Sequence, residues 1–251
     1  MTALATDPTV RPRPARTWRA VLRLHRAALT GWAVLVTAVS AGLLWAYGPG
    51  GSAAYTVAEV LIGWVPYLAA VWAGTFVARE LQRGTVRLAW TQGVTPNRWL
   101  ATSLAVPAAL LTAGNTVLVL LHRLVSDAHQ VPEGWNPWND ETFTANGTLA
   151  IVHPLLGLAV GTLAGFLQRH AVTAAGLAIA AMGLALTTLG FARPHLWPTA
   201  AHVGNLRGGY YAGNRPASDF WPLQLVETGI VVAVAALVLG TAFALLRRRT
   251  S

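Results

Sequence analysis

Long apolar stretches alternate with shorter polar segments along most of the chain. A helix of roughly 20 largely uncharged residues is long enough to cross a bilayer, and six stretches of the sequence meet that requirement. They occupy residues 29–47, 56–78, 99–121, 145–167, 171–191 and 223–246. The hydrophobic pattern therefore predicts an all-α integral membrane protein with six transmembrane helices.

The amino-acid composition also indicates a membrane protein, and it excludes several kinds of chemical site. The 251 residues are 54% hydrophobic and 11% charged, with a mean hydropathy of +0.49, which is not typical of a soluble domain. Cysteine is absent, and all 18 basic residues are arginine. Without lysine the sequence has no Walker A loop, so a partner chain would have to bind any ATP and Mg²⁺. We expect no catalytic, cofactor-binding or metal-binding residues in this chain.

The arginines are sorted between the two sides of the predicted spans. Most of them precede the first span, follow the second or follow the last, and an even number of spans places both termini on one side. The positive-inside rule assigns that side to the cytoplasm. We therefore expect a multi-pass protein of the cell membrane with both termini cytoplasmic. Because this sorting accounts for the net charge of +9, nucleic acid is not an expected partner.

The segment before the first span has two parts. Residues 1–15 are proline-rich and lack periodicity, which predicts a disordered cytoplasmic leader ahead of a transmembrane domain over residues 16–251. Four arginines then recur on one helical face: Arg16, Arg19, Arg23 and Arg26. This pattern predicts an amphipathic interfacial helix that contacts membrane lipids in the inner headgroup layer. The alternative is that these arginines only set the topology.

The cytoplasmic segment after the second span, residues 79–98, is longer than a simple connection needs. The spacing of its apolar residues predicts that the second span continues into the cytosol as an amphipathic helix, which Gly93 ends. Thr95 then serves as an N-cap and Pro96 as the first residue of the next helix. Such a rigid element favours a docking surface for a partner. The alternative is that its arginines merely anchor the segment inside.

Two stretches of the chain resemble a known family. The run from Arg79 to Trp99 strongly resembles the segment after the second span in permease subunits of ABC-2 type ATP-binding cassette transporters, in their high-GC bacterial branch. The stretch from Asn214 to Glu227 is similar to the entry of the last span in that family. The chain departs from the family at Ala101, Thr102 and Ser103, where relatives often carry a basic residue.

The resemblance implies an export function that depends on partners. Each permease would dimerise with a second copy or a paralogue and would bind one ABC ATPase subunit, which holds ATP and Mg²⁺. ATPase movement would reach the spans through seven residues: Arg79, Glu80, Arg83, Gly84, Thr85, Arg87 and Arg98. The alternative is an ATPase-independent membrane protein, either a small secondary transporter or a non-catalytic scaffold. No clear repeat relates the first three spans to the last three, which disfavours a secondary transporter.

Several polar and small residues stand out within the spans. Four polar side chains are candidates for a gate or a substrate contact: Glu59, Asn115, His153 and Glu227. Intramembrane carboxylates are often functional, but both glutamates also lie near helix N-termini, where the helix dipole stabilises them. For the other two, helix packing is the alternative. A stripe of Gly157, Gly161 and Gly165 lets a second helix approach closely, either from the same chain or from a second subunit.

Overall fold

The computed structural model describes residues 17–84, 95–128, 138–168, 170–197 and 217–250. Its long helices are α1 (Thr17–Trp45), α2 (Gly51–Arg83), α4 (Pro96–Ala128), α6 (Leu149–Leu167), α7 (Ala171–Ala192) and α8 (Phe220–Thr250). Its short elements are η1 (Ala46–Gly50), α5 (Asp140–Ala145), η2 (Arg193–His195) and η4 (Ala217–Asp219). These residues contain no strand, and six helices are long and apolar enough to cross a membrane. The predicted all-α architecture with six spans is therefore confirmed.

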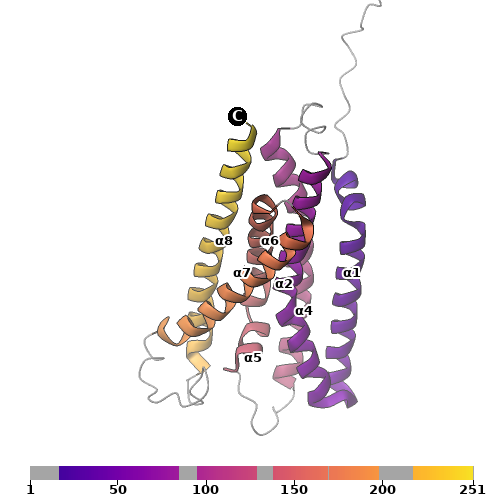
Figure 1. Ribbon diagram of the computed structural model, residues 1–251. Helices are drawn as coiled ribbons and strands as arrows, with labels where there is room; N and C mark the ends of the chain where they lie inside the picture. The colour runs from indigo at the N-terminus through magenta and orange to yellow at the C-terminus, as the bar shows by residue number, and fades with distance from the viewer. Residues whose placement is uncertain (1–16, 85–94, 129–137, 169, 198–216, 251) are drawn as a thin grey trace, which may run out of the picture.

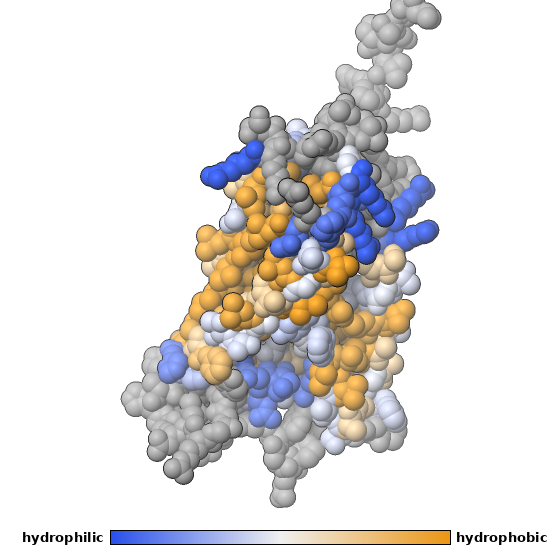
Figure 2. Space-filling model, in the orientation of Figure 1, coloured by the Kyte–Doolittle hydropathy of each residue, from blue (hydrophilic) through white to orange (hydrophobic). Residues whose placement is uncertain are grey.

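Successive long helices run in alternating directions (Figure 1). The start of α1 and the end of α8 therefore lie at the same end of the bundle, together with the end of α2 and the start of α4. The described part of this end carries seven exposed arginines: Arg23, Arg26, Arg79, Arg83, Arg98, Arg247 and Arg248. Figure 2 shows hydrophilic residues gathered here, above a broad apolar band. We call this end the Arg-rich end.

Helix α6 is the most buried of the six spans and packs against α2, α4, α7 and α8. Its glycine stripe faces α2. A Cβ atom added to Gly157 or Gly161 would overlap a backbone carbonyl of α2, and one added to Gly165 would lie 2.8 Å from another. The helix that approaches the stripe therefore belongs to the same chain. Helix α7 crosses α6 and α2 obliquely, with α1 and α8 on opposite sides of the bundle (Figure 1).

The first two helices differ from the sequence prediction at their ends. The amphipathic entry segment forms the first turns of α1, which runs without a break into the first span. No proline interrupts residues 17–45, so the sequence supplies no reason for a separate element. Helix α2 begins at Gly51, where a φ of 58° favours glycine. The connection between the first two spans is thus shorter than predicted.

The segment between the second and third spans requires a correction. Helix α2 ends at Arg83 because Gly84 adopts a left-handed φ of 68°, a common way for glycine to end a helix. The predicted unbroken continuation as far as Gly93 is therefore wrong, and residues 85–94 lie outside the described residues. The predicted start of the third span is confirmed. Helix α4 begins at Pro96, and the Arg98 N–H donates to the Thr95 hydroxyl at 3.4 Å.

The third span is longer than the apolar stretch that predicted it. Residues 122–144 were expected to connect the third and fourth spans, but α4 continues to Ala128 and α5 begins at Asp140. The extension places His122 inside a buried cluster of polar side chains. Because Asn146 and Tyr55 lie within hydrogen-bond distance of His122 Nδ1 and Glu59 lies close to its Nε2, the helix does not have to end where the apolar stretch does.

Candidate functional site

A cavity of about 390 Å³ lies between α2, α5, α6 and α7, in the half of the bundle away from the Arg-rich end. Its volume is within the range of small-molecule sites in proteins. The cavity wall carries seven polar side chains: Tyr67, Asp140, Glu141, Thr144, His153, Thr187 and Arg193. Polar groups inside an apolar bundle are costly unless they are paired or have a function, so this cavity is the candidate functional site.

Arg193, directly after α7, forms the centre of an ion network beside the cavity. Its Nε donates to Glu227 Oε2 at 2.6 Å, and its Nη2 donates to Glu227 Oε1 at 2.7 Å. Its Nη1 donates to Asp140 Oδ1 at 2.5 Å, and its guanidinium lies over the Phe143 ring. Arg193 is 3% exposed and Glu227 is fully buried. This bidentate geometry is the kind that offsets the cost of burying charge, and it joins α5, α8 and the end of α7.

Gln224 of α8 holds α5 and the start of α6 in place. Its buried side chain donates from Nε2 to the Phe143 carbonyl at 2.5 Å and accepts at Oε1 from the Leu149 N–H at 3.4 Å. One turn further along α8, the hydroxyl oxygens of Thr228 and Thr148 are 2.6 Å apart. These bonds fix the short helix that carries the acidic residues of the cavity.

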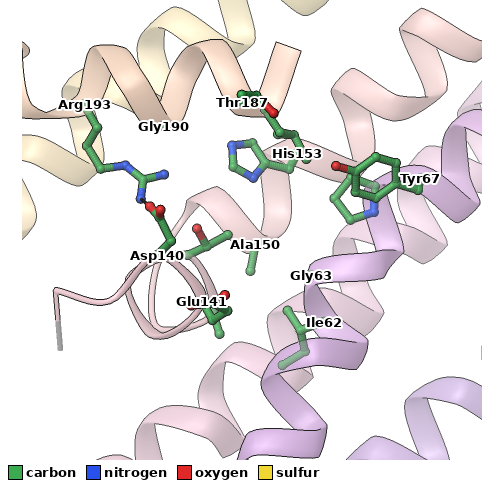
Figure 3. A pocket seen from close by; sticks show the side chains of 14 residues that line it. Ile62, Gly63, Tyr67, Asp140, Glu141, Ala150, His153, Thr187, Gly190 and Arg193 are labelled. Carbon is green, nitrogen blue, oxygen red and sulfur yellow. Dashed lines mark hydrogen bonds and ion pairs between the residues drawn. The ribbon is translucent and has the colours of Figure 1, made fainter. Parts of the chain in front are cut away.

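His153 and two helix prolines shape the opposite side of the cavity. His153 is 4% exposed, and its Nε2 has no hydrogen-bond partner among the described residues. Figure 3 shows His153 across the cavity from the Arg193–Asp140 pair. Pro66 in α2 and Pro154 in α6 cannot donate to the carbonyl four residues earlier. Those carbonyls belong to Ile62 and Ala150, which both line the cavity.

A second buried polar cluster lies apart from the cavity. His122 Nε2 of α4 is 3.3 Å from Glu59 Oε1 of α2, and His122 Nδ1 is 2.6 Å from Asn146 Oδ1. The Tyr55 hydroxyl is 3.3 Å from the same Nδ1 atom. His122 is fully buried and Glu59 is 5% exposed. This cluster connects α2 and α4 with the turn before α6.

The structure separates the four polar span residues predicted from the sequence. His153 lines the cavity, and Glu227 lies behind the cavity wall, paired with Arg193. Glu59 belongs to the second cluster. Asn115 is fully buried, and its Nδ2 donates to the Leu111 carbonyl of its own helix at 2.8 Å. The four residues therefore do not form one site.

The predicted coupling residues lie near the Arg-rich end where the structure describes them. The exposed ones are Arg79, Arg83 and Arg98. Glu80 is 8% exposed, so its side chain does not present a surface to a partner. Gly84 ends α2, while Thr85 and Arg87 lie outside the described residues.

Sequence reasoning missed most of the cavity wall. The predicted spans leave Arg193, Asp140 and Glu141 in the outer segments between them, and Gln224 was not singled out. One signal was available, because a carboxylate within a span requires a partner. Glu227 therefore pointed to a nearby cation, and Arg193 follows the preceding span directly. Nothing in the local pattern indicated that Asp140 would join this pair.

The amino-acid sequence matches one known protein family over a region that includes the cavity. The model of the family described as ABC-2 membrane transporter related matches residues 43–193. This match covers more than half of the chain, so the protein belongs to that family. Every residue that lines the cavity, from Ile62 to Arg193, falls within the match. No curated protein matches the chain. The six apolar helices and the family together identify a multi-pass membrane protein of a transporter family.

Proposed function

We propose that this chain is the permease subunit of an ATP-driven ABC-2 type exporter from the high-GC bacterial branch of that family. A separate ATPase would bind ATP and Mg²⁺, and a second permease copy or a paralogue would complete the transporter. Both termini would be cytoplasmic in the cell membrane, with lipid around the apolar band. The observation that carries the proposal is the family match over residues 43–193, in a sequence that lacks the lysine of a Walker A loop.

Within the Arg-rich end, the end of α2 and the start of α4 form the surface proposed to contact the ATPase. Arg79 and Arg83 are exposed at the end of α2, and Arg98 is exposed at the start of α4. Exposed arginines contribute little to stability, and the positive-inside rule accounts for the side of the membrane on which they lie. We propose that these three also contact the ATPase. An acidic ATPase surface would complement them.

Helix α2 offers a path from this surface to the cavity. The same uninterrupted helix carries Arg83 at the Arg-rich end and Tyr67 at the cavity wall. Sixteen residues of α-helix separate them, which corresponds to roughly 24 Å. Because the glycine stripe of α6 packs directly on the α2 backbone, displacement of α2 would move α6 as well. We propose that ATPase movement reaches the cavity in this way.

The proposal predicts that an ATPase with Walker motifs is encoded beside this gene, and co-purification of the chain with that ATPase is the test. The variant Arg79→Ala/Arg83→Ala/Arg98→Ala should lose the ATPase, because all three side chains are exposed on the proposed surface. The variant Arg23→Ala/Arg26→Ala/Arg248→Ala removes the same charge from exposed positions on α1 and α8 and should retain the ATPase. Equal retention by both variants would contradict the docking surface. Transport by the purified chain without any ATPase would contradict the proposed function.

A further inference from the structure

We propose that the cavity between α2, α5, α6 and α7 binds a small organic cation with an ammonium head and an apolar body. The first support is the balance of charge in the wall. Among the described lining residues, Arg193 is the one cationic guanidinium, and its donors reach Glu227 and Asp140. Glu141 adds a further carboxylate at an exposed position of the wall. Carboxylates therefore exceed guanidinium groups, and the cavity attracts positive charge.

The second support is the hydrogen-bonding character of the wall. Pro66 and Pro154 leave the Ile62 and Ala150 carbonyls without their usual helical donor, and both residues line the cavity. Carbonyl and carboxylate oxygens only accept hydrogen bonds. A ligand that supplies several N–H donors from one point is therefore favoured, and an ammonium group is such a ligand.

His153 provides the third support, which is independent of the acidic residues. It is a polar side chain more than nine-tenths buried, it lines the cavity, and its Nε2 has no hydrogen-bond partner among the described residues. An unsatisfied buried polar atom costs free energy, which a ligand in the cavity would recover. A neutral imidazole can accept a hydrogen bond at Nε2 from an ammonium or a hydroxyl group.

The rest of the wall limits the size and character of the ligand. Ile62, Ala145 and Leu186 give the cavity an apolar part next to the polar one. The volume of about 390 Å³ accommodates an amine with a single ring. The site is formed within one chain, so binding requires neither an ATPase nor a second permease copy. Failure of ATPase coupling would consequently leave this inference standing, and absence of the ligand would leave the coupling proposal standing.

Three matched probes test the inference by isothermal titration on the purified full-length chain in lipid-free detergent. They are 2-phenylethylamine, 2-phenylethanol and phenylacetate, which are a cation, a neutral molecule and an anion of similar size. We expect the amine to bind roughly tenfold more tightly than the alcohol, and the anion not to bind measurably. Equal binding of amine and alcohol, or no saturable binding of the amine, would overturn the inference.

Two variants with different expected signatures locate the binding site. Glu141→Lys should abolish the preference for the amine over the alcohol, whereas Asp127→Lys should preserve it, because Asp127 is exposed on α4 away from the cavity. His153→Phe should weaken the binding of the amine and of the alcohol to the same extent, because both ligands lose the contact with Nε2. His195→Phe, at an exposed position outside the cavity wall, is the matched control. Unchanged binding in folded Glu141→Lys and His153→Phe proteins would contradict the location.

An ammonium group could come from a soluble amine or from a lipid headgroup. Repeating the titration in nanodiscs of phosphatidylethanolamine and of phosphatidylglycerol separates these sources. Competition by the first lipid alone would support the ammonium site and assign its occupant to the lipid. Undiminished amine binding in both would support a soluble amine. Competition by phosphatidylglycerol alone would contradict a preference for cations.

Discussion

Two opposite types of contact hold α6 within the bundle. Toward α2, its glycines bring backbone against backbone, and the α2 side chains that also approach them are those of Ala69 and Val77. Toward α8, the polar contacts are the hydrogen bonds of Gln224 and Thr228 at the start of α6, next to the Glu227–Arg193–Asp140 network that joins α8, the end of α7 and α5. The first interface depends on shape, and the second depends on chemical pairing.

This difference suggests how a bundle with a polar cavity can move without unfolding. Close packing in a membrane interior tolerates little change, since an added atom has nowhere to go. Hydrogen bonds and ion pairs can break and form again with other partners or with water. We therefore expect α2 and α6 to move as one unit, and α5 and α8 to be the elements that shift when the cavity changes shape.

The largest loss of stability is expected from breaking the buried ion pair between Arg193 and Glu227. Arg193→Met leaves the fully buried Glu227 carboxylate without its two hydrogen bonds. Removing one member of a buried pair costs about 3–5 kcal/mol, measured as a fall in unfolding free energy in detergent. The double variant Arg193→Met/Glu227→Met should recover most of that loss. If the single variant were as stable as the double, the ion network would not hold α5 and α8 together.

A smaller loss of stability is expected when a single methyl group is added at the interface between α6 and α2. Gly161→Ala places a Cβ atom into the Ala70 backbone, and overpacking of this kind costs about 1–3 kcal/mol. Gly176→Ala in α7 is the matched control, because its added Cβ meets nothing within 4 Å and alanine favours the helix. Thermal unfolding should therefore separate the two substitutions. Equal melting temperatures would contradict direct packing of the α2 and α6 backbones.

The two types of contact also differ in how far the sequence predicts them. The glycine stripe recurs every four residues in one helix, so its packing role follows from local spacing. Only the identity of the approaching helix stayed open until the structure placed α2 against it. The six spans could be predicted because each is a continuous apolar run in the sequence. Helix α4 is the exception in length, since it extends beyond its apolar run to Ala128.

The polar side could not be predicted in this way. Arg193, Asp140 and Glu227 come from three elements that are far apart in the chain. The need of Glu227 for a cation points to Arg193, but the sequence contains no signal that brings Asp140 to this pair. The end of α2 was missed for another reason. The apolar spacing continues past Gly84, but its left-handed conformation ends the helix, so turn chemistry prevails over periodicity at that residue.

The smallest effect tests whether ordinary hydrogen bonds on the polar side matter beside the charges. Thr228→Val keeps the shape of the side chain but removes the hydroxyl that lies 2.6 Å from Thr148 Oγ1. Hydrogen bonds between helices in a membrane protein contribute about 0.6 kcal/mol on average, and we expect a loss of that order. Thr241→Val on the same helix is the control, because the Thr241 hydroxyl donates only within α8, to the Leu237 carbonyl, at an exposed position. A larger loss for Thr228→Val than for Thr241→Val, measured by thermal unfolding, would show that the Thr228–Thr148 pair stabilises the start of this interface in addition to Gln224. Equal losses would restrict the polar pairing between α8 and α6 to Gln224, while apolar packing such as that of Phe166 with Ala242 and Leu246 would hold the rest of the interface.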